Sequence, residues 1–550
     1  MSDTNKVASH GHPVNLSNEE DGAALGRLGA WIDHHQHWLL ATIMVLAAAA
    51  RVQGLTSGSL YRDDAWVALT NHFSLSTSAN MLVTTPGFTL FERFWTGLAP
   101  TTTWFAQIPS LIAGLVAIWA IFALVTFFKF EAWISLTCAF ILAISTEATI
   151  YATHVKPYAF DLVAAAALLW LGERARRDPR RATLLAVGLA SVAFAAWSFT
   201  NTIVVAGVFI VLGVTCLWRR VALGWFAVSG VIAGSGVTLT FIVIDSEVTT
   251  ALRSFWKTNY LETGSFHALL ASGEVAARGL LTQELGYHPI FGHVTIVGTI
   301  DATILAGLIA TGLFFSWRRQ ALATSVLGVA IVLALFHRVP IGTNRTDAYL
   351  FPALLLLVAS GLAKVGSVLS RRAPRHAITT LIAVSAALCL VLGGARLADV
   401  PTYPGGNIKS ALPDIEPTLR KPGGTLLVQG AARWVWAYYE DPGAHLIFGQ
   451  NFNTGFTVVS NRQKIIIAPH TQHEPGFNAE AIARTVSRSR HLVTLNFYDW
   501  TGKHDPTGRA LLRHCWKKTS QHLTDQFQVT TYERQATLGC RLGVRDKATS

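Results

Sequence analysis

Charged residues are scarce in this chain: Asp, Glu, Lys and Arg together make up 14% of its 550 residues, while hydrophobic residues make up 51%. A soluble protein of this size would carry nearly twice that share of charge. The sequence therefore excludes an ordinary soluble enzyme. Repeated apolar runs of about 18 to 22 residues, separated by short polar turns, indicate instead a helical protein that crosses a membrane several times.

Basic residues are in excess, but they are not arranged for nucleic acid. The formal net charge is +12, yet no stripe of Lys and Arg interleaved with aromatic residues runs along the chain. The sequence therefore predicts no nucleic-acid partner. Residues 1–33 are polar and are expected to form a disordered cytoplasmic N-terminus. They lack the basic region of a cleavable signal peptide, so the first membrane helix is expected to stay attached.

About eleven membrane spans are predicted over a domain of residues 34–400, by testing each loop against the positive-inside rule from a cytoplasmic N-terminus. They lie near residues 38–55, 104–128, 132–152, 157–172, 182–198, 202–218, 222–244, 294–316, 320–337, 347–367 and 376–397. On this count every arginine-rich loop falls on the cytoplasmic side. These loops are residues 173–181, 218–220, 317–319 and 370–375.

Residues 401–550 differ in character and are predicted to form an extracytoplasmic α/β domain, because their apolar runs are too short to span a bilayer. Strands are expected near residues 425–428, 464–467 and 492–495, and helices near 431–439, 479–487 and 509–519. Cysteine is rare in the chain, but Cys515 and Cys540 both lie in this domain. Its compartment allows a disulfide between them, whereas sequence separation leaves their geometry open.

Two adjacent carboxylates beside a cation follow the first apolar run, in the sequence Arg62-Asp63-Asp64. Charge in hydrocarbon is costly and is rarely kept there without a function. We therefore interpret this stretch as the catalytic corner of a membrane enzyme. The alternative is that Arg62 and Asp64 are interfacial anchors in a solvated loop.

A second polar cluster spans residues 147–158, on the same predicted face of the membrane. Lys156 precedes Pro157, and a fixed ammonium at the membrane surface is suited to gripping a phosphate. The alternative is a snorkelling lysine beside a tyrosine of the aromatic belt.

A third cluster opens the tenth predicted span. Arg345 with Asn344 offers a guanidinium fork and a neutral donor for phosphate or sugar oxygens at the start of a helix. The alternative pairs Arg345 with Asp347 as a local bridge. The long outer loop, residues 245–293, fits either a carbohydrate-lined groove or an amphipathic helix on the membrane surface. His288 is the one residue of this loop that is a candidate for substrate binding.

Together these clusters resemble the GT-C superfamily of polyprenyl-phosphate-sugar-dependent membrane glycosyltransferases, over roughly residues 35–400. The bacterial protein mannosyltransferases and lipid A aminoarabinose transferases are the similar branch. The matching motifs are Arg62-Asp63-Asp64-Ala65, Thr85-Pro86-Gly87-Phe88, Gln107-Ile108-Pro109-Ser110, the stretch from Tyr151 to Asp161, and the stretch from Arg345 to Pro352. Gln107 replaces the family's usual Arg. The Asp-Asp pair also resembles membrane arabinofuranosyltransferases, so the donor sugar stays open.

The resemblance implies an inverting transfer of a sugar from a polyprenyl-phosphate donor to a cell-envelope glycan, lipid or protein, at the outer face of the bacterial inner (plasma) membrane. Asp63 would be the general base. Lys156 and Arg345 would cradle the donor phosphate, with His154 and Tyr158 as supporting donors.

The remaining candidates have less specific roles. Asp64 cannot point the same way as Asp63, so it is expected to orient Arg62, bind acceptor hydroxyls or hold a divalent cation (Mg, Mn or Ca). Arg62, Asn344 and His288 are expected to bind substrate. No cofactor is certain, and the lack of a Gly-rich phosphate loop argues against a nucleotide-sugar donor.

Two other classes of function fit part of the sequence. A transporter or flippase of lipid-linked sugars also needs cations at a membrane-embedded site, but it usually shows internal repeats, which this sequence lacks. A sensor or scaffold leaves the Asp-Asp and Lys-Pro-Tyr clusters without a role. Within the last domain, four aromatic residues could supply a sugar platform, although their spacing is more typical of a core. They are Trp434, Trp436, Tyr438 and Tyr439.

Overall fold

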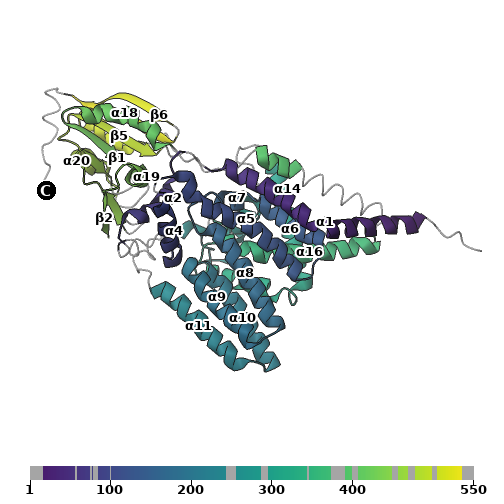
Figure 1. The fold of residues 1–550 in the computed structure, drawn as a ribbon. Helices are drawn as coiled ribbons and strands as arrows, with labels where there is room; N and C mark the ends of the chain where they lie inside the picture. The colour runs from purple at the N-terminus through teal and green to yellow at the C-terminus, as the bar shows by residue number, and fades with distance from the viewer. Residues whose placement is uncertain are drawn as a thin grey trace, which may run out of the picture.

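The structure is a computed structural model. It describes residues 17–55, 58–74, 77, 84–99, 101–242, 256–285, 295–343, 346–372, 391–398, 407–430, 432–448, 456–468, 477–497, 505–524 and 526–535. A large helical domain, here called the membrane domain, carries a smaller domain built on a sheet, here called the tail domain (Figure 1). The tail domain comprises the described residues from 407 onward.

The described helices of the membrane domain follow one another in the order expected from the apolar runs. They are α1 (Ser17–Gln53), α2 (Arg62–Ala68), η1 (Leu69–His72), α4 (Pro86–Leu98), α5 (Thr103–Phe127), α6 (Ala132–Ile144), α7 (Thr146–Tyr151), α8 (Tyr158–Arg177), α9 (Arg181–Trp197), α10 (Asn201–Arg219), α11 (Leu223–Ile242), η2 (Lys257–Asn259), α13 (Phe266–Arg278), η3 (Gly279–Leu285), α14 (Thr295–Ser316), α15 (Ala321–Leu335), η4 (Ala348–Leu350) and α16 (Phe351–Arg372).

Four helices in the described part of the chain are long and apolar enough to cross a membrane, or up to five if the pair bent by 116° between α14 and α15 counts as one span. The chain is therefore a multi-pass membrane protein. A helix lies at each of the first ten predicted spans, while most of the eleventh falls in residues 373–390, outside the described part. The count of eleven spans stays a prediction.

The structure differs from the sequence-based expectations at the N-terminal residues and at the third predicted span. Helix α1 begins at Ser17, so residues 17–33 are helical instead of disordered. The third predicted span is broken at Ser145, where α6 ends and α7 begins. Ser145 caps α7 by accepting a hydrogen bond from the backbone N–H of Ala148, at 3.3 Å. A side-chain cap of this kind satisfies a helix N–H that would otherwise lack a partner.

On the other side of this break, two buried arginines donate hydrogen bonds to the last carbonyl groups of α6. Arg51 of α1 donates to the carbonyl oxygens of residues 142 and 143, at 3.4 and 3.1 Å. Arg396, in the helical residues 391–398, donates to the carbonyl oxygen of Ile144 at 2.9 Å. The last carbonyl groups of a helix have no partner within it. The two guanidinium groups therefore stabilise the end of α6 immediately before the second polar cluster.

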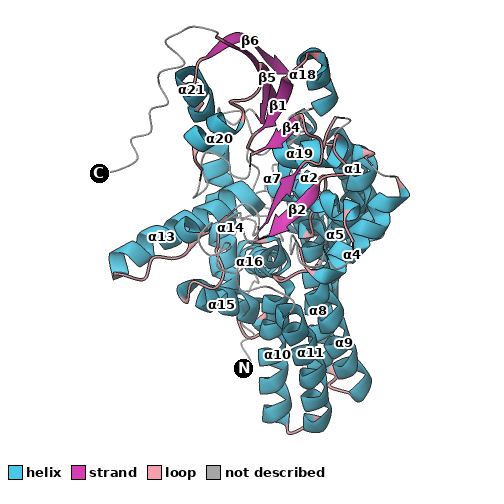
Figure 2. Cartoon of the chain, turned by 90° about the vertical axis from the view of Figure 1, so that its left-hand side faces the viewer, coloured by secondary structure: helices cyan, strands magenta, loops and turns pink. Residues whose placement is uncertain are grey.

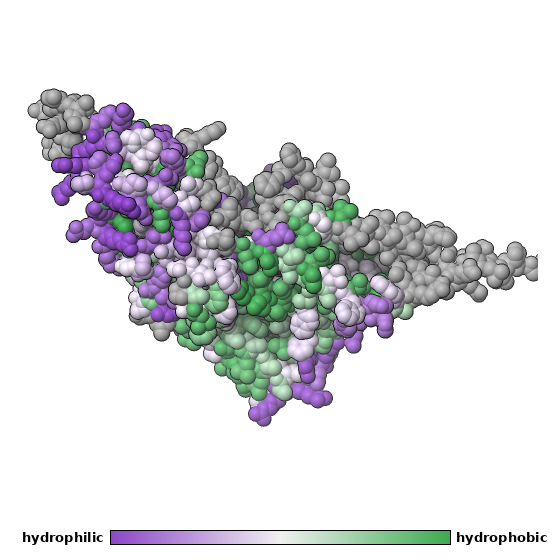
Figure 3. Space-filling view, turned by 45° about the horizontal axis from the view of Figure 1, so that its top comes forward, coloured by the Kyte–Doolittle hydropathy of each residue, from purple (hydrophilic) through white to green (hydrophobic). Residues whose placement is uncertain are grey.

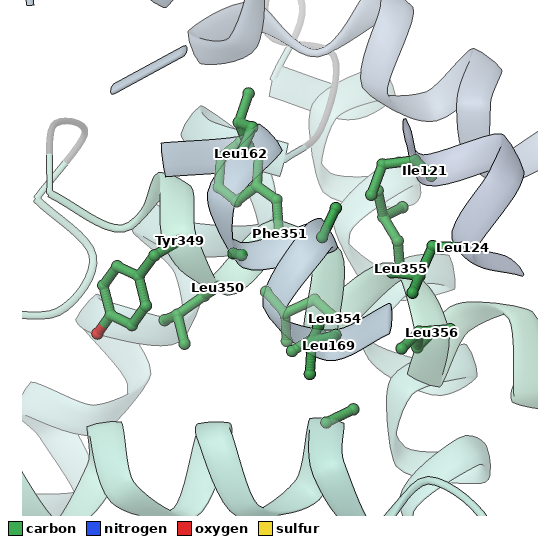
Figure 4. Packing of buried hydrophobic residues seen from close by; sticks show 14 of the residues in the cluster. Ile121, Leu124, Leu162, Leu169, Tyr349, Leu350, Phe351, Leu354, Leu355 and Leu356 are labelled. Atoms are coloured by element: carbon green, nitrogen blue, oxygen red, sulfur yellow. The ribbon is translucent and has the colours of Figure 1, made fainter. Parts of the chain in front are cut away.

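Apolar packing of α5, α8 and α16 forms the centre of the membrane domain. Figure 4 shows buried side chains of the three helices packed together, with Leu162 of α8 at Phe351 of α16 and Leu355 of α16 beside Leu124 of α5. Ile121 of α5, Leu169 of α8 and Leu355 of α16 are all fully buried. This packing fixes the ends of three helices relative to one another, including the end of α8 that follows Lys156.

The arginine-rich turns gather at one end of these helices. Arg219 donates to the carbonyl oxygen of Arg176 at 3.1 Å, and Arg319 donates to that of Phe128 at 3.1 Å. At the opposite end of α5, the Thr103 hydroxyl donates to the carbonyl oxygen of Gly58 at 2.5 Å. Helix α5 therefore runs from the Asp63-Asp64 corner to the arginine-rich end.

The tail domain has the α/β character expected from its sequence. Its elements are α18 (Ile408–Arg420), β1 (Gly424–Val428), α19 (Ala432–Tyr439), β2 (His445–Phe448), β3 (Phe456–Val459), β4 (Ile465–Ile467), α20 (Ala479–Thr485), β5 (His491–Phe497), α21 (Pro506–Arg513), β6 (Trp516–Thr524) and β7 (Phe527–Arg534). Among these described strands, five form a sheet of order β4-β1-β5-β7-β6, in which β4 and β5 run parallel to β1. Residues 516–519, predicted as helix, begin strand β6 instead.

The two domains differ in surface character. The sheet lies at one end of the helical bundle in Figure 2, and hydrophilic residues cover much of it in Figure 3, whereas hydrophobic residues cover much of the visible helical surface.

Cys515 is disulfide-bonded. Cys540, its expected partner, lies outside the described residues.

Candidate active site

The two adjacent carboxylates lie in the first turn of α2 but in different surroundings. Asp64 is buried, whereas the Asp63 side chain keeps 25% of its surface exposed. Arg62 Nε lies 3.5 Å from Asp63 Oδ1. Orienting Arg62 is one of the three roles expected of Asp64, but this ion pair is made by Asp63. Side chains one residue apart on a helix point in different directions, so the two carboxylates cannot share one role.

Asp64 pairs with the second polar cluster. His154 Nδ1 lies 2.9 Å from Asp64 Oδ1, across ninety positions of sequence. Both side chains are buried. The turn that carries His154 is held by Gln107 of α5, whose side-chain amide donates to the carbonyl oxygen of Thr153 at 2.5 Å. Gln107 thus fixes the backbone beside the Asp64–His154 pair.

Lys156 lies on the same corner. Its side chain is buried, and its Nζ lies 5.0 Å from the ring centroid of Trp66 in α2. A snorkelling lysine keeps its ammonium group in water, so the buried position does not fit that alternative. An ammonium over an indole face is held by the ring's quadrupole. The contact fixes Lys156 beside α2.

Tyr158 and Asp161 take up supporting positions in α8. The Tyr158 ring lies 5.1 Å from that of Tyr151, centroid to centroid. Asp161 accepts hydrogen bonds from the Thr200 hydroxyl at 2.9 Å and from the Asn201 side-chain amide at 3.3 Å. Asp161 therefore joins α8 to the start of α10.

The third cluster and one outer-loop candidate are not placed. Asn344, Arg345 and His288 lie outside the described residues. Asp347, the alternative partner of Arg345, accepts hydrogen bonds from the backbone N–H groups of residues 342 and 343, at 2.8 and 3.1 Å. Asp347 therefore shapes the loop that leads to residues 344 and 345.

The described part of the outer loop contains the amphipathic helix that was one of its two alternatives. In α13 the side chains of Phe266 and Leu270, four residues apart and so on one face of the helix, are exposed, at 76% and 58%, while Ala276 is buried. Figure 2 shows α13 projecting from the helical bundle. An exposed apolar face of this kind is typical of a helix that lies on a membrane surface.

Glu92 is a residue near this site that sequence reasoning missed. It lies in α4, on the face that also buries Phe88 and Thr96, and only 1% of its surface is exposed. Burial, together with the negative charge of Asp64, raises the pKa of Glu92 to about 8. The spacing of four residues from Phe88 to Glu92 to Thr96 was the available signal, because such residues share one helix face.

The start of α4 contains the Thr85-Pro86-Gly87-Phe88 motif. Gly87 packs so closely on the end of α9 that an added Cβ would lie 2.6 Å from the carbonyl oxygen of Ala196. The hydroxyl of Thr85 donates to the carbonyl oxygen of Trp197. This motif therefore docks α4 against α9 and brings Glu92 toward the Asp64 corner.

A divalent cation was one role left open for Asp64. Among the described residues, no group of three or more His, Cys, Asp and Glu side chains is arranged to hold a metal ion. Asp64 and His154 contact each other directly. We therefore derive no step through a metal.

No protein-family model and no curated protein matches the sequence, whereas solved structures resemble the fold. The apo structure of ArnT from Cupriavidus metallidurans is 12% identical in sequence. The match covers 92% of this chain and 98% of the ArnT chain, with a TM-score of 0.50.

Two further structures match less well. For ArnT from the same organism bound to undecaprenyl phosphate, identity is 12%, coverage is 91% of this chain and 98% of that chain, and the TM-score is 0.46. The Archaeoglobus fulgidus oligosaccharyltransferase tethered with an acceptor peptide is 13% identical in sequence. That match covers 84% of this chain and 69% of the oligosaccharyltransferase chain, with a TM-score of 0.46.

Proposed function

We propose that this chain, which has the GT-C fold shared with ArnT, is an inverting membrane glycosyltransferase that moves a sugar from a polyprenyl-phosphate donor to an acceptor outside the cytoplasm. The observation that carries the proposal is the meeting of two clusters at one corner. Asp64 contacts His154, and Trp66 contacts Lys156, so carboxylates and a cation from distant parts of the sequence lie together.

Asp63 is the general base in this proposal. Its side chain is the more exposed of the two carboxylates, so an acceptor hydroxyl can reach it. Asp63 takes the proton of that hydroxyl as the acceptor oxygen attacks the anomeric carbon of the sugar. The bond from this carbon to the phosphate oxygen breaks in the same step, so the anomeric configuration inverts. The products are the glycosylated acceptor and the polyprenyl phosphate.

Lys156 stabilises the departing phosphate. Negative charge develops on the leaving oxygens as the bond to the sugar breaks, and a fixed cation in a site of low polarity lowers the energy of that charge. The cation–π contact with Trp66 holds the Lys156 ammonium in place before the donor binds. Tyr158 and Arg345 are proposed as further donors to the phosphate, and His154 acts through its bond to Asp64.

The proposed orientation places this corner outside the cytoplasm. The arginine-rich turns lie together at the other end of the helices, and such turns are enriched on the cytoplasmic side. The disulfide of Cys515 supports the same orientation for the tail domain, because disulfides persist in oxidising compartments. The bacterial inner membrane is the proposed location, and the acceptor is a glycan, lipid or protein of the cell envelope.

The test is transfer of radiolabelled sugar by purified protein in detergent, from polyprenyl-phosphate donors that carry mannose, glucose, arabinofuranose or aminoarabinose. Endogenous lipid and glycan acceptors are added. We expect labelled product from one donor with the wild type and a rate at least about 100-fold lower with Asp63→Asn. Failure of every donor, or equal product from the Asp63→Asn variant, would overturn the proposal.

A further inference from the structure

The tail domain packs directly on the corner that carries Asp63 and Asp64. Its helix α19 lies against α2, and the two labels are neighbours in Figure 1. Buried residues of both domains form one hydrophobic cluster, in which Ala65 and Leu69 of the membrane domain join Val435 and Ala437 of α19. The two domains therefore share a core at this point, and α19 is part of the surroundings of α2.

One contact of α19 reaches Lys156 through a tryptophan. Trp434 stacks on Trp66, with ring centroids 6.0 Å apart and planes 24° from parallel. Trp66 is the residue whose ring also holds the Lys156 ammonium. On the tail side, the guanidinium of Arg433 lies 4.5 Å from the Trp434 ring. The position of Lys156 thus depends on an aromatic stack that the tail domain completes.

A second contact of α19 reaches the start of α2 through a hydroxyl. The Tyr439 hydroxyl accepts a hydrogen bond from the backbone N–H of Leu60 at 3.0 Å, and a hydrogen bond of 2.6 Å joins it to the Thr103 hydroxyl. Burial raises the pKa of the Tyr439 hydroxyl to about 12. Leu60 lies three residues before Asp63. Tyr439 therefore ties the stretch of backbone that leads into α2 to the start of α5.

The burial of these aromatic residues shows how α19 acts. Trp434 and Trp436 are 5% and 3% exposed, and Tyr438 is 1% exposed. Tyr438 stacks on His72 of η1, with centroids 5.0 Å apart. Side chains so buried do not present a face to a sugar. The platform considered from the sequence is therefore replaced by an interface between the domains.

We propose that helix α19 is a positioning element of the active site, in which Trp434 sets the place of Lys156 and Tyr439 sets the place of Asp63. The proposal rests on the proposed function, because it assigns Lys156 to the donor phosphate and Asp63 to the acceptor proton. The proposal also gives the tail domain a role in catalysis. Helix α19 carries no catalytic residue, but transfer requires this domain because α19 positions two residues that act on the substrates.

The two contacts have different expected effects on transfer. Trp434→Leu removes the ring behind Trp66, so the Lys156 ammonium loses its fixed place. The donor KM should rise by about tenfold and kcat should fall as well, because Lys156 meets the phosphate both in the bound donor and as it departs. Tyr439→Phe removes one hydroxyl and loosens the approach to Asp63. It lowers kcat by about tenfold and leaves the donor KM unchanged.

The tail domain offers matched controls. Trp516 and Tyr532 are also buried, but they belong to a separate hydrophobic cluster on the other part of the sheet. Trp516→Leu and Tyr532→Phe therefore test loss of tail-domain stability alone. We expect both controls to keep the wild-type kcat and donor KM for the protein that remains folded. Equal kinetic effects of the controls and of the α19 variants would overturn the proposal.

A second measurement does not depend on activity. In Tyr439→Phe the N–H of Leu60 loses its acceptor, so the backbone that leads into α2 is held less firmly. Hydrogen–deuterium exchange of the amides in residues 58–68 of the full-length protein should therefore become at least about tenfold faster. It should stay at the wild-type rate in Tyr532→Phe. Unchanged exchange in Tyr439→Phe contradicts the proposal. A wild type that transfers no sugar from any donor contradicts the proposed function instead, and the exchange result then still decides the role of Tyr439.

Discussion

His154 Nδ1 lies 2.9 Å from Asp64 Oδ1, and both side chains are buried where α2 meets the turn before α8. The pair joins the two polar clusters on which the proposed mechanism depends. If either partner is removed, the other is left buried without its hydrogen bond, which costs several kcal/mol when it is charged. The pair is therefore expected to behave as a unit.

The first prediction is a double-mutant cycle on this pair. Asp64→Asn and His154→Ala should each lower kcat for sugar transfer by roughly tenfold or more, and the double variant should be no slower than the slower single variant. His514→Ala is the control, because His514 bonds to Glu480 in the tail domain, away from this corner. Effects that simply multiply in the double variant would show that Asp64 and His154 act independently.

The second prediction concerns the grip on the donor phosphate. Lys156→Met should raise the donor KM by roughly 10- to 100-fold, because the variant keeps much of the apolar stem but loses the charge that meets the phosphate. Lys156→Arg should not restore the wild-type KM, since a planar guanidinium does not occupy the ammonium's place over Trp66. The exposed Lys129 supplies the control substitution Lys129→Met. An unchanged KM in Lys156→Met would remove Lys156 from the donor site.

The third prediction is a pH dependence of stability through Glu92. Its pKa is raised from 4.5 to about 8 by burial and by the charge of Asp64, and the buried Tyr438 hydroxyl also lies near it. Between these pH values the folded protein binds more protons than the unfolded chain. The contribution of Glu92 to stability is therefore present below pH 4.5 and is lost as pH rises through about 8.

The measurement is thermal unfolding in detergent between pH 5 and 8.5. Wild-type stability should fall by up to about 1.4 kcal/mol per pH unit through Glu92. Glu92→Gln resembles the protonated acid, so it should flatten this dependence and melt higher than the wild type at pH 8.5. Glu274→Gln, at an exposed position, is the control. Parallel pH curves for the wild type and Glu92→Gln would contradict the assignment.

The fourth prediction separates structure from catalysis at Asp161. Asp161→Ala leaves the Thr200 hydroxyl and the Asn201 amide without their buried acceptor, so it should destabilise the protein by about 2 kcal/mol or more. The donor KM of the folded fraction should stay near the wild-type value. Asp178→Ala, half-exposed at the arginine-rich end, should change neither property. Loss of activity with an unchanged melting temperature would instead place Asp161 in the chemistry.

Features set by local pattern could be predicted from the sequence. The apolar runs predicted helices at the first ten spans, since burial in hydrocarbon requires long apolar stretches. The order of the polar motifs predicted that Asp64 and Lys156 belong to one region. The short apolar runs after residue 400 predicted the strands β1, β4 and β5, because strands buried in a sheet need only a few apolar residues.

Features set by tertiary contacts could not be predicted in this way. The partner of Asp64 is ninety positions away, and no spacing rule connects it to His154. Arg51 lies inside the first predicted span, where a charge signals a function, but only the fold shows that its role is to satisfy the end of α6. The stack of Trp434 on Trp66 joins two domains, and the helical spacing of the α19 aromatics indicated only that they pack in a core.

The most direct test of the account separates donor binding from transfer in one variant. With the donor identified from the panel, its dissociation constant and the single-turnover transfer rate are measured for the wild type, Asp63→Asn and the control Asp178→Asn. The account predicts that Asp63→Asn binds donor within about threefold of the wild type but transfers its sugar roughly 10²- to 10⁴-fold more slowly, because only the acceptor proton lacks its base. Transfer by Asp63→Asn at the wild-type rate would contradict it.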